Sequence, residues 1–172
     1  MQPEDQRRPD PKYTVIPRTL IFLTRGARLL LLKGAPDKRL WAGKYNGLGG
    51  HIEADETPWQ SARRETREET GLDVRNLQLR GVVHITMPDP PGVMLFVFVG
   101  EAFAGHIHAS DEGTPTWVSV EEVHTLPLVE DLHELIPRVL EPGPVISAHY
   151  TFTDEGLQMA FEPQHRSKLE AV

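Results

Sequence analysis

The chain has no cysteine, no apolar run of membrane-spanning length and no excess of basic residues. Without cysteine it forms no disulfide or thiolate metal site, and it has no cysteine nucleophile. A transmembrane helix needs about 20 consecutive apolar residues, and the polar first twelve residues lack the apolar core of a signal peptide. We therefore expect a protein of the cytoplasm that contacts no membrane.

The charge balance is acidic, with 25 Asp and Glu residues against 18 Lys and Arg residues and a net charge of −7. This balance disfavours sequence-independent binding to nucleic acid, and a polyanionic ligand must then be met by local cations. The length of 172 residues and the 39% hydrophobic content are typical of one globular domain. We expect that domain at residues 13–162, between flexible tails at 1–12 and 163–172. Monomer and homodimer both remain open.

The helix signals are densest between residues 49 and 72, which read GGHIEADETPWQSARRETREETGL. Thr57 suits the N-cap, Pro58 the first helical position, and Gln60 completes a capping box. Gly71 is placed to end the helix in a left-handed turn. These signals predict a helix over residues 58–70.

Three glutamates of this helix, Glu65, Glu68 and Glu69, are three and four residues apart and therefore share one face. Like charges at this spacing repel, so either the carboxylates are spread into solvent or a divalent cation lies between them. The less polar side carries Trp59, Ala62 and Thr66, and we expect it to pack inward.

Alternating apolar residues predict strands elsewhere, and leucines at 29–32 predict a strand that is covered on both faces. Helical patterns occur at 121–125 and 130–140. This mixture predicts an α/β fold with a mixed sheet between helices. The expected strands are 13–24, 28–32, 77–87, 93–103, 116–118 and a closing hairpin of 145–153 with 157–162.

A loop at 34–46, bordered by lysines, leads into Gly47-Leu48-Gly49-Gly50 directly ahead of the glutamate helix. Missing side chains at such a cluster let the backbone approach a metal or a phosphate closely.

One long pattern joins these features: Gly50, five residues, Glu56, seven residues, then RETREETGL from Arg64 to Leu72. It resembles the complete Nudix box, with every fixed position filled. The resemblance implies an α/β/α sandwich with a mixed central sheet. It also implies a hydrolase that uses Mg²⁺, or Mn²⁺ in its place, to let water attack a phosphorus of a nucleoside diphosphate linked to another moiety.

By position, the resemblance makes Glu65, Glu68 and Glu69 metal-binding carboxylates and adds the Gly49 carbonyl as a further ligand. Arg64 is implied to hold a neighbouring carboxylate in place.

The segment 109–117 is similar to a loop of MutT-like enzymes that carries a glutamate for metal binding or water activation. Glu112 occupies that place, and the resemblance leaves Glu112 and Glu69 as alternatives for the general base.

Residues 31–50 and the hairpin residues 148–152 resemble the oxidised-purine nucleoside triphosphatases of MutT type. The resemblance implies that Asn46 contacts the base, although an Asn-Gly pair is equally typical of a turn. Lys33 or Lys44 would meet phosphate. Glu130 and Asp131 are the nearest match to an acidic pair that reads the base.

We therefore expect a Mg²⁺-dependent nucleoside triphosphate pyrophosphohydrolase that converts 8-oxo-dGTP or a related (d)NTP to the monophosphate and pyrophosphate. One alternative keeps the chemistry and takes ADP-ribose or a dinucleoside polyphosphate as substrate. Another is a non-catalytic regulatory module that binds a nucleotide.

Overall fold

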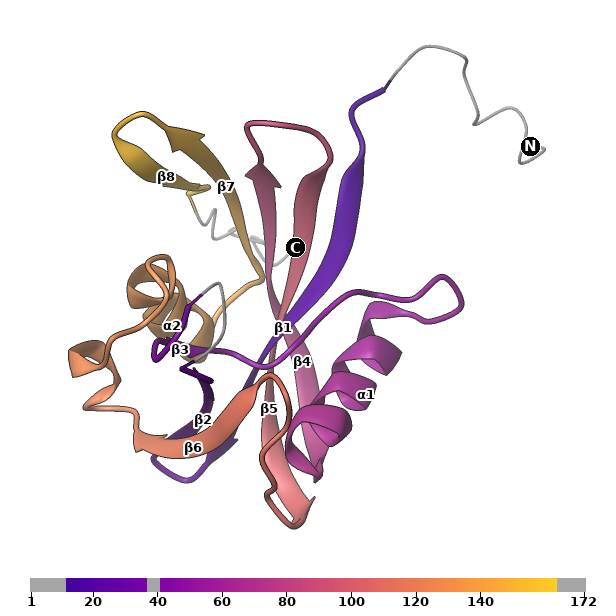
Figure 1. Ribbon diagram of the computed structural model, residues 1–172, viewed down its shortest axis with the longest axis vertical. Coiled ribbons are helices and arrows are strands. Elements are labelled where there is room, and N and C mark those ends of the chain that lie inside the picture. The colour runs from indigo at the N-terminus through magenta and orange to yellow at the C-terminus, as the bar shows by residue number, and fades with distance from the viewer. Residues whose placement is uncertain (1–11, 37–40, 164–172) are drawn as a thin grey trace, which may run out of the picture.

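The computed structural model describes residues 12–36 and 41–163, which form an eight-stranded mixed sheet with a helix on each side (Figure 1). The strand order is β3-β2-β1-β5-β4-β7-β8, and β6 pairs with β2. The elements are β1 Val15–Arg25, β2 Arg28–Gly34, β3 Tyr45–Asn46, α1 Pro58–Thr70, β4 Leu72–Thr86, β5 Gly92–Gly105, β6 Gly113–Ser119, a 3₁₀ turn η2 Val123–Thr125, α2 Leu132–Leu140, β7 Ile146–Thr153 and β8 Gly156–Phe161.

The sheet is mixed because β1 runs parallel to β5 and β4 runs parallel to β7, whereas the other pairs are antiparallel. The prediction of an α/β fold with a mixed sheet between helices is confirmed. Among the described residues, no helix is long and apolar enough to cross a membrane.

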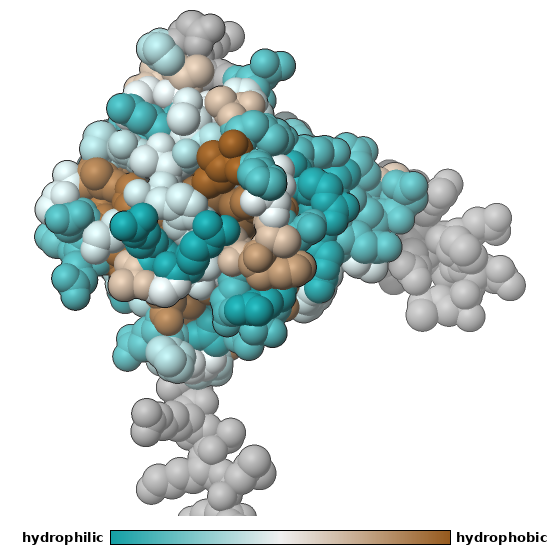
Figure 2. Space-filling view, turned by 90° about the horizontal axis from the view of Figure 1, so that it is seen from below, coloured by the Kyte–Doolittle hydropathy of each residue, from teal (hydrophilic) through white to brown (hydrophobic). Residues whose placement is uncertain are grey.

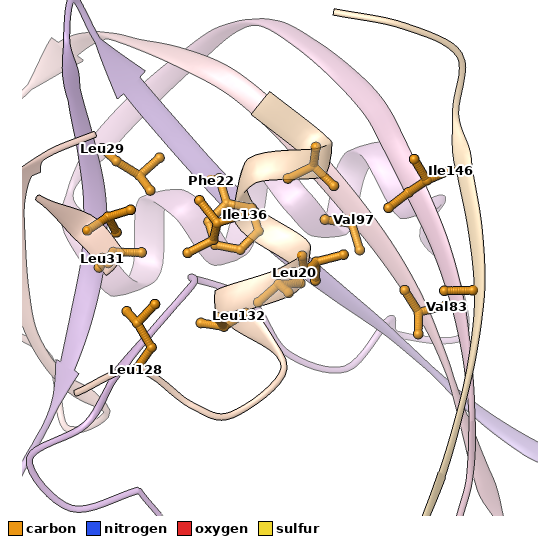
Figure 3. Close-up of a cluster of buried hydrophobic side chains, with 14 of the residues drawn as sticks. Leu20, Phe22, Leu29, Leu31, Val83, Val97, Leu128, Leu132, Ile136 and Ile146 are labelled. Carbon is orange, nitrogen blue, oxygen red and sulfur yellow. The ribbon is translucent and has the colours of Figure 1, made fainter. Parts of the chain in front are cut away.

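Alternation along the strands builds one core on each face of the sheet. Leu20 and Phe22 of β1 pack into the cluster beneath α2, which Figure 3 shows, whereas Ile21 and Leu23 pack into the cluster beneath α1. The leucines of β2 at 29–32 divide between the two clusters in the same way, and all four are buried. The predicted strand covered on both faces is confirmed. Figure 2 shows the surface at one end of the molecule, where hydrophobic patches are separated by hydrophilic residues.

Helix α1 has the predicted bounds and caps. The Thr57 hydroxyl accepts a hydrogen bond from the backbone amide of Gln60, and the Gln60 side chain accepts one from the backbone amide of Thr57. At the other end, Gly71 follows the helix with a φ of 73°. Ala62 and Thr66 are fully buried, as expected. Trp59 is 42% exposed, so the expectation that it packs inward is wrong in part. It lies on the first turn of the helix and meets the Phe98 ring only edge-on, at 5.0 Å between centroids.

Several helices and strands begin or end at other residues than the local sequence patterns predict. Pairing with strands that are distant in the sequence extends or shortens them. β4 begins at Leu72, where it pairs with Gly105, and β6 begins at Gly113, where it pairs with Gly34. The pattern at 121–125 forms only a single 3₁₀ turn. The expected tails at 1–12 and 163–172 lie outside the described residues except for one residue each.

The Gly47–Gly50 segment is attached to β1 by backbone hydrogen bonds. The Ile21 amide donates to the Leu48 carbonyl at 2.7 Å, and the Thr19 amide donates to the Gly50 carbonyl at 2.9 Å. Gly49 has a φ of 133°, and a Cβ at this position would lie 2.2 Å from the Thr19 carbonyl oxygen. Only glycine therefore lets this loop pass so close to the sheet.

We predict that Gly49→Ala is strongly destabilising and that Gly26→Ala is a mild matched control. Gly26 also has a positive φ, of 60°, but a Cβ at this position would have open space within 4 Å. The control therefore costs only the left-handed backbone penalty, about 1–2 kcal/mol. Gly49→Ala adds an overpacking cost of about 1–3 kcal/mol. Urea unfolding measures both, and equal midpoints for the two variants would contradict the close approach of the loop.

Candidate active site

Arg64 of α1 holds three carboxylates together. Its Nε and Nη2 donate to the two oxygens of Glu56 at 3.1 and 2.6 Å. Its Nη1 donates to Glu65 and to Glu68, each at 2.9 Å. The forked geometry of guanidinium makes this bidentate pairing possible. The hydrogen bonds from Arg64 lower the pKa of Glu56 to about 2, so Glu56 is ionised at neutral pH.

Glu69 is the buried carboxylate of the site, with 6% of its surface exposed. The Gly49 amide donates to its Oε2 at 2.8 Å. Burial raises the pKa of Glu69 to about 8 in spite of this hydrogen bond, and the negative charges of Glu65, Glu112 and Glu68 raise it further.

Glu65 lies against the glycine loop. A Cβ at Gly50 would come within 2.4 Å of Glu65 Oε1, so the carboxylate occupies the space that a side chain would take. The Glu68 side chain is 59% exposed on the outer side of the same helix. The three glutamates therefore differ in environment, from the buried Glu69 to the solvated Glu68. Glu69 accepts a hydrogen bond from the Gly49 amide, and Glu65 lies beside Gly50.

Glu112 reaches this site from a distant part of the sequence. The β5–β6 connection passes beside the end of α1, where the His108 amide donates to the Thr70 carbonyl at 3.2 Å (Figure 1). The charge of Glu112 contributes to the raised pKa of Glu69, which places it within electrostatic reach of the buried carboxylate.

The donor set of this site is hard oxygen, the type that Mg²⁺ prefers. The carboxylates of Glu65, Glu68 and Glu112 raise the pKa of Glu69, and a cation among them relieves that repulsion. Within residues 12–36 and 41–163, no three acidic or histidine side chains already form a metal cage. Mg²⁺ is commonly held by one or two carboxylates together with water and substrate phosphate, and the residues present fit that mode.

A cavity of about 520 Å³ opens beside the glycine loop on the α2 face of the sheet. The predicted substrate residues Lys44, Asn46, Glu130 and Asp131 line it, and so does Gly49. Lys33 is not part of this lining, and its Nζ lies 5.7 Å from the centre of the Tyr45 ring.

Asn46 makes a local turn contact and also lines the cavity. Its Oδ1 accepts from the Gly47 amide at 2.8 Å, which is local turn chemistry, and the residue also lines the cavity. Burial raises the pKa of the Asp131 carboxyl, and the charge of Glu130 adds to the rise.

Three large apolar residues, Trp41, Met87 and Phe152, also line the cavity, and of these Met87 was not considered from the sequence. All three are more than one third exposed although they are large and apolar. Tyr150 of β7 also lines the cavity, and the alternation of the closing hairpin was the signal that could have placed it on the inner face. The apolar residues meet only through folding, because they come from a loop, the end of β4 and the closing hairpin.

A mixed sheet between two helices, with a glycine loop set against a glutamate helix, defines the class of α/β/α phosphohydrolase to which this chain is similar. The NUDIX domain family model matches residues 15–139, and the chain belongs to this family. It is a hydrolase that acts on phosphoric anhydride bonds. Hydrolases of the family generally act on small nucleotides with divalent metal ions such as Mg²⁺.

Relatives of known name agree with this assignment. An uncharacterised Nudix hydrolase, YvcI, of Bacillus subtilis is 29% identical over 79% of this chain and 88% of its own. The oxidized purine nucleoside triphosphate hydrolase of Danio rerio is 33% identical over 61% of this chain and 67% of its own. The crystal structure of a MutT protein from Bacillus halodurans has a TM-score of 0.77 and 25% identity, and covers 87% of this chain and 99% of its own.

We predict that Glu69→Gln abolishes hydrolysis yet stabilises the metal-free protein at alkaline pH. The pKa of Glu69 rises from 4.5 to about 8 on folding, so this group costs the wild type stability as the pH rises from about 4.5 to 8. Gln does not titrate, and its advantage therefore grows across this window to a limit on the order of 5 kcal/mol. Chemical denaturation in EDTA at pH 5, 7 and 9 measures it. A variant less stable than wild type at pH 9 would contradict the burial of this charge.

We predict that Arg64→Ala lowers hydrolysis about 10–100-fold, the usual effect of losing a residue that orients metal ligands. Arg64→Lys should recover only part of this, because an ammonium lacks the bidentate fork. Arg67→Ala is the matched control, since Arg67 lies in the same helix with a 73% exposed side chain and pairs with Asp73. Initial rates at saturating Mg²⁺ measure all three variants, and equal losses at positions 64 and 67 would refute the role of Arg64.

Proposed function

We propose that this protein is a Mg²⁺-dependent nucleoside triphosphate pyrophosphohydrolase that converts 8-oxo-dGTP or a related (d)NTP to the monophosphate and pyrophosphate. One observation carries the proposal. A single cavity joins the Gly49 loop, beside the carboxylates, to Asn46, Glu130 and Asp131 on the side where a base would lie.

The cavity suits a nucleoside in size and chemistry. Its volume of about 520 Å³ falls in the range of roughly 300–1,000 Å³ typical of small-molecule sites. Its walls include apolar side chains from Trp41, Met87 and Phe152, which offer flat or flexible surfaces to a base. The Asn46 amide both donates and accepts hydrogen bonds, and the Asp131 carboxylate accepts them. Such groups match the mixed donor and acceptor edge of a purine.

The triphosphate of such a nucleotide extends toward the Gly49 end of the cavity. Lys44 lines the cavity, and in this proposal its ammonium meets the phosphates. Glu65, Glu68 and Glu69, with the Gly49 carbonyl and Glu112, would hold Mg²⁺. When bound, the ion supplies charge neutralisation and a more acidic water.

The attacking water must lose a proton as its oxygen bonds to phosphorus and the anhydride bond breaks. Glu69 and Glu112 are the candidate acceptors, because Arg64 pairs with Glu65 and Glu68. Without a metal ion the pKa of Glu69 is about 8, and a cation beside this carboxylate would lower that pKa, which leaves it ionised and able to accept a proton. Arg64 keeps Glu65 and Glu68 oriented while the proton moves.

The oxidized purine nucleoside triphosphate hydrolases among the relatives support the substrate class. The alternatives are ADP-ribose or a dinucleoside polyphosphate as substrate, and a non-catalytic module. The complete set of box carboxylates favours catalysis over the last of these.

We predict that hydrolysis requires Mg²⁺ and that kcat/KM falls in the order 8-oxo-dGTP, dGTP, dCTP, since the cavity offers a purine-sized space with a polar edge. The panel also contains ADP-ribose and a dinucleoside polyphosphate, and chromatography identifies the monophosphate and pyrophosphate products. EDTA is the control for metal dependence. If no dNTP is cleaved, the proposed substrate class is wrong.

Asp131→Ala should reduce the preference for 8-oxo-dGTP over dGTP in the same assay. Asp154→Ala is the matched control, because Asp154 is an exposed residue in the turn of the closing hairpin and does not line the cavity. If the discrimination ratio is unchanged in both variants, Asp131 does not read the base.

A further inference from the structure

The Tyr150 hydroxyl stands out in the hydrogen-bond pattern of the described residues. Among their side chains it is the only buried polar atom without a hydrogen-bond partner, and the residue is 1% exposed. Buried polar groups are nearly always paired, since an unpaired one loses its bonds to water without replacement. The hydroxyl therefore calls for an explanation that packing does not supply.

The ring of Tyr150 is accounted for by the core. It belongs to the cluster beneath α2 and meets the Phe161 ring edge-on at 6.0 Å between centroids. Phenylalanine makes the same apolar contacts without burying an oxygen. Packing thus explains an aromatic residue at this position but does not explain the hydroxyl.

Asp131, near Tyr150, also lacks a hydrogen bond that is usual for its position in the chain. It occupies the N-cap position of α2, where an aspartate usually accepts a backbone amide of the first turn, yet it makes no side-chain capping bond. Both residues line the same cavity. They are close enough to interact electrostatically, because burial and then the charge of Asp131 raise the pKa of the Tyr150 hydroxyl.

We propose that Tyr150 is a positioning residue for substrate specificity: its hydroxyl donates to the Asp131 carboxyl once a nucleotide fills the cavity, and it thereby holds that carboxyl against the edge of the base. This inference rests on the proposed function, which supplies the nucleotide. In the free protein the Tyr150 hydroxyl has no hydrogen-bond partner, and Asp131 lines the same cavity without capping α2. The substrate gives Asp131 a partner, and Tyr150 then fixes its orientation.

This pairing of Tyr150 with Asp131 disfavours nucleotides whose base does not reach the Asp131 carboxyl. A base that engages Asp131 lets the buried Tyr150 hydroxyl gain a partner, whereas a base without a suitable edge leaves that hydroxyl unpaired. Discrimination of this kind is larger than apolar contacts alone provide, because leaving buried polar groups unpaired is costly.

Tyr150→Phe tests the proposal, with Tyr13→Phe as the matched control. Tyr13 is half exposed, its hydroxyl lies 2.9 Å from His84 Nε2, and it does not line the cavity. In the free protein, we expect Tyr150→Phe to unfold at the wild-type temperature or above, because the removed hydroxyl has no partner there.

With 8-oxo-dGTP as substrate, we expect KM to rise roughly three- to tenfold, the loss of one hydrogen bond, with kcat within about twofold of wild type. Combining Tyr150→Phe with Asp131→Ala should raise KM no further than Asp131→Ala alone, since the hydroxyl acts through that carboxyl. Tyr13→Phe should change neither constant.

An unchanged KM, or an additive effect in the double variant, would overturn the proposal. So would a lower unfolding temperature in the free protein together with a uniform fall in kcat, which would indicate a structural hydroxyl. If the wild type cleaves ADP-ribose and no dNTP, the proposed substrate fails separately, and the wild type and the four variants are compared on ADP-ribose. A rise in KM there with Tyr150→Phe that is absent with Tyr13→Phe and disappears in the Asp131→Ala background would support the positioning role, and its absence would refute it.

Discussion

The hydrogen bond from the Gly49 amide to the buried carboxylate of Glu69 joins the two parts of the molecule on which its chemistry depends. On one side is a loop whose glycines let it pair with β1 at contact distance. On the other is helix α1, which is fixed by a capping box at one end and a left-handed glycine at the other. Because the bond connects them, the loop and the glutamate face keep one relative position, and the end of the cavity is defined.

Arg64 complements this bond on the outer side of the helix. It pairs with Glu56, Glu65 and Glu68 and so holds three carboxylates together in one small region. Glu69, in contrast, is buried and is not one of the carboxylates that Arg64 pairs with. This difference explains why the pKa of Glu69 is raised while the pKa of Glu56 is lowered. Two neighbouring carboxylates with opposite shifts are typical of sites where one group holds charge and another exchanges a proton.

The sheet separates the two functions of the site. Helix α1 and its carboxylates cover one face, whereas the cavity with Asn46, Asp131 and Tyr150 opens on the face that carries α2. The glycine loop passes between them at the edge of β1 and is the one segment that belongs to both. In the proposed function, bond cleavage and base selection would therefore depend on residues of different elements, which Gly49 connects.

The sequence by itself determined the local features of this protein. Helix α1, its caps, the interior strand at 29–32 and the closing hairpin follow from propensity and periodicity, which act over a few residues. The Nudix box is likewise a local pattern, and family membership followed from it. Only the tertiary structure decided which carboxylate is buried, since Glu65, Glu68 and Glu69 look alike in the helix and differ through what packs on them. It also brought the connection that carries Glu112 beside the end of α1, and Tyr150 and Asp131 to one cavity. These residues are far apart in the chain, and no short-range pattern records their proximity.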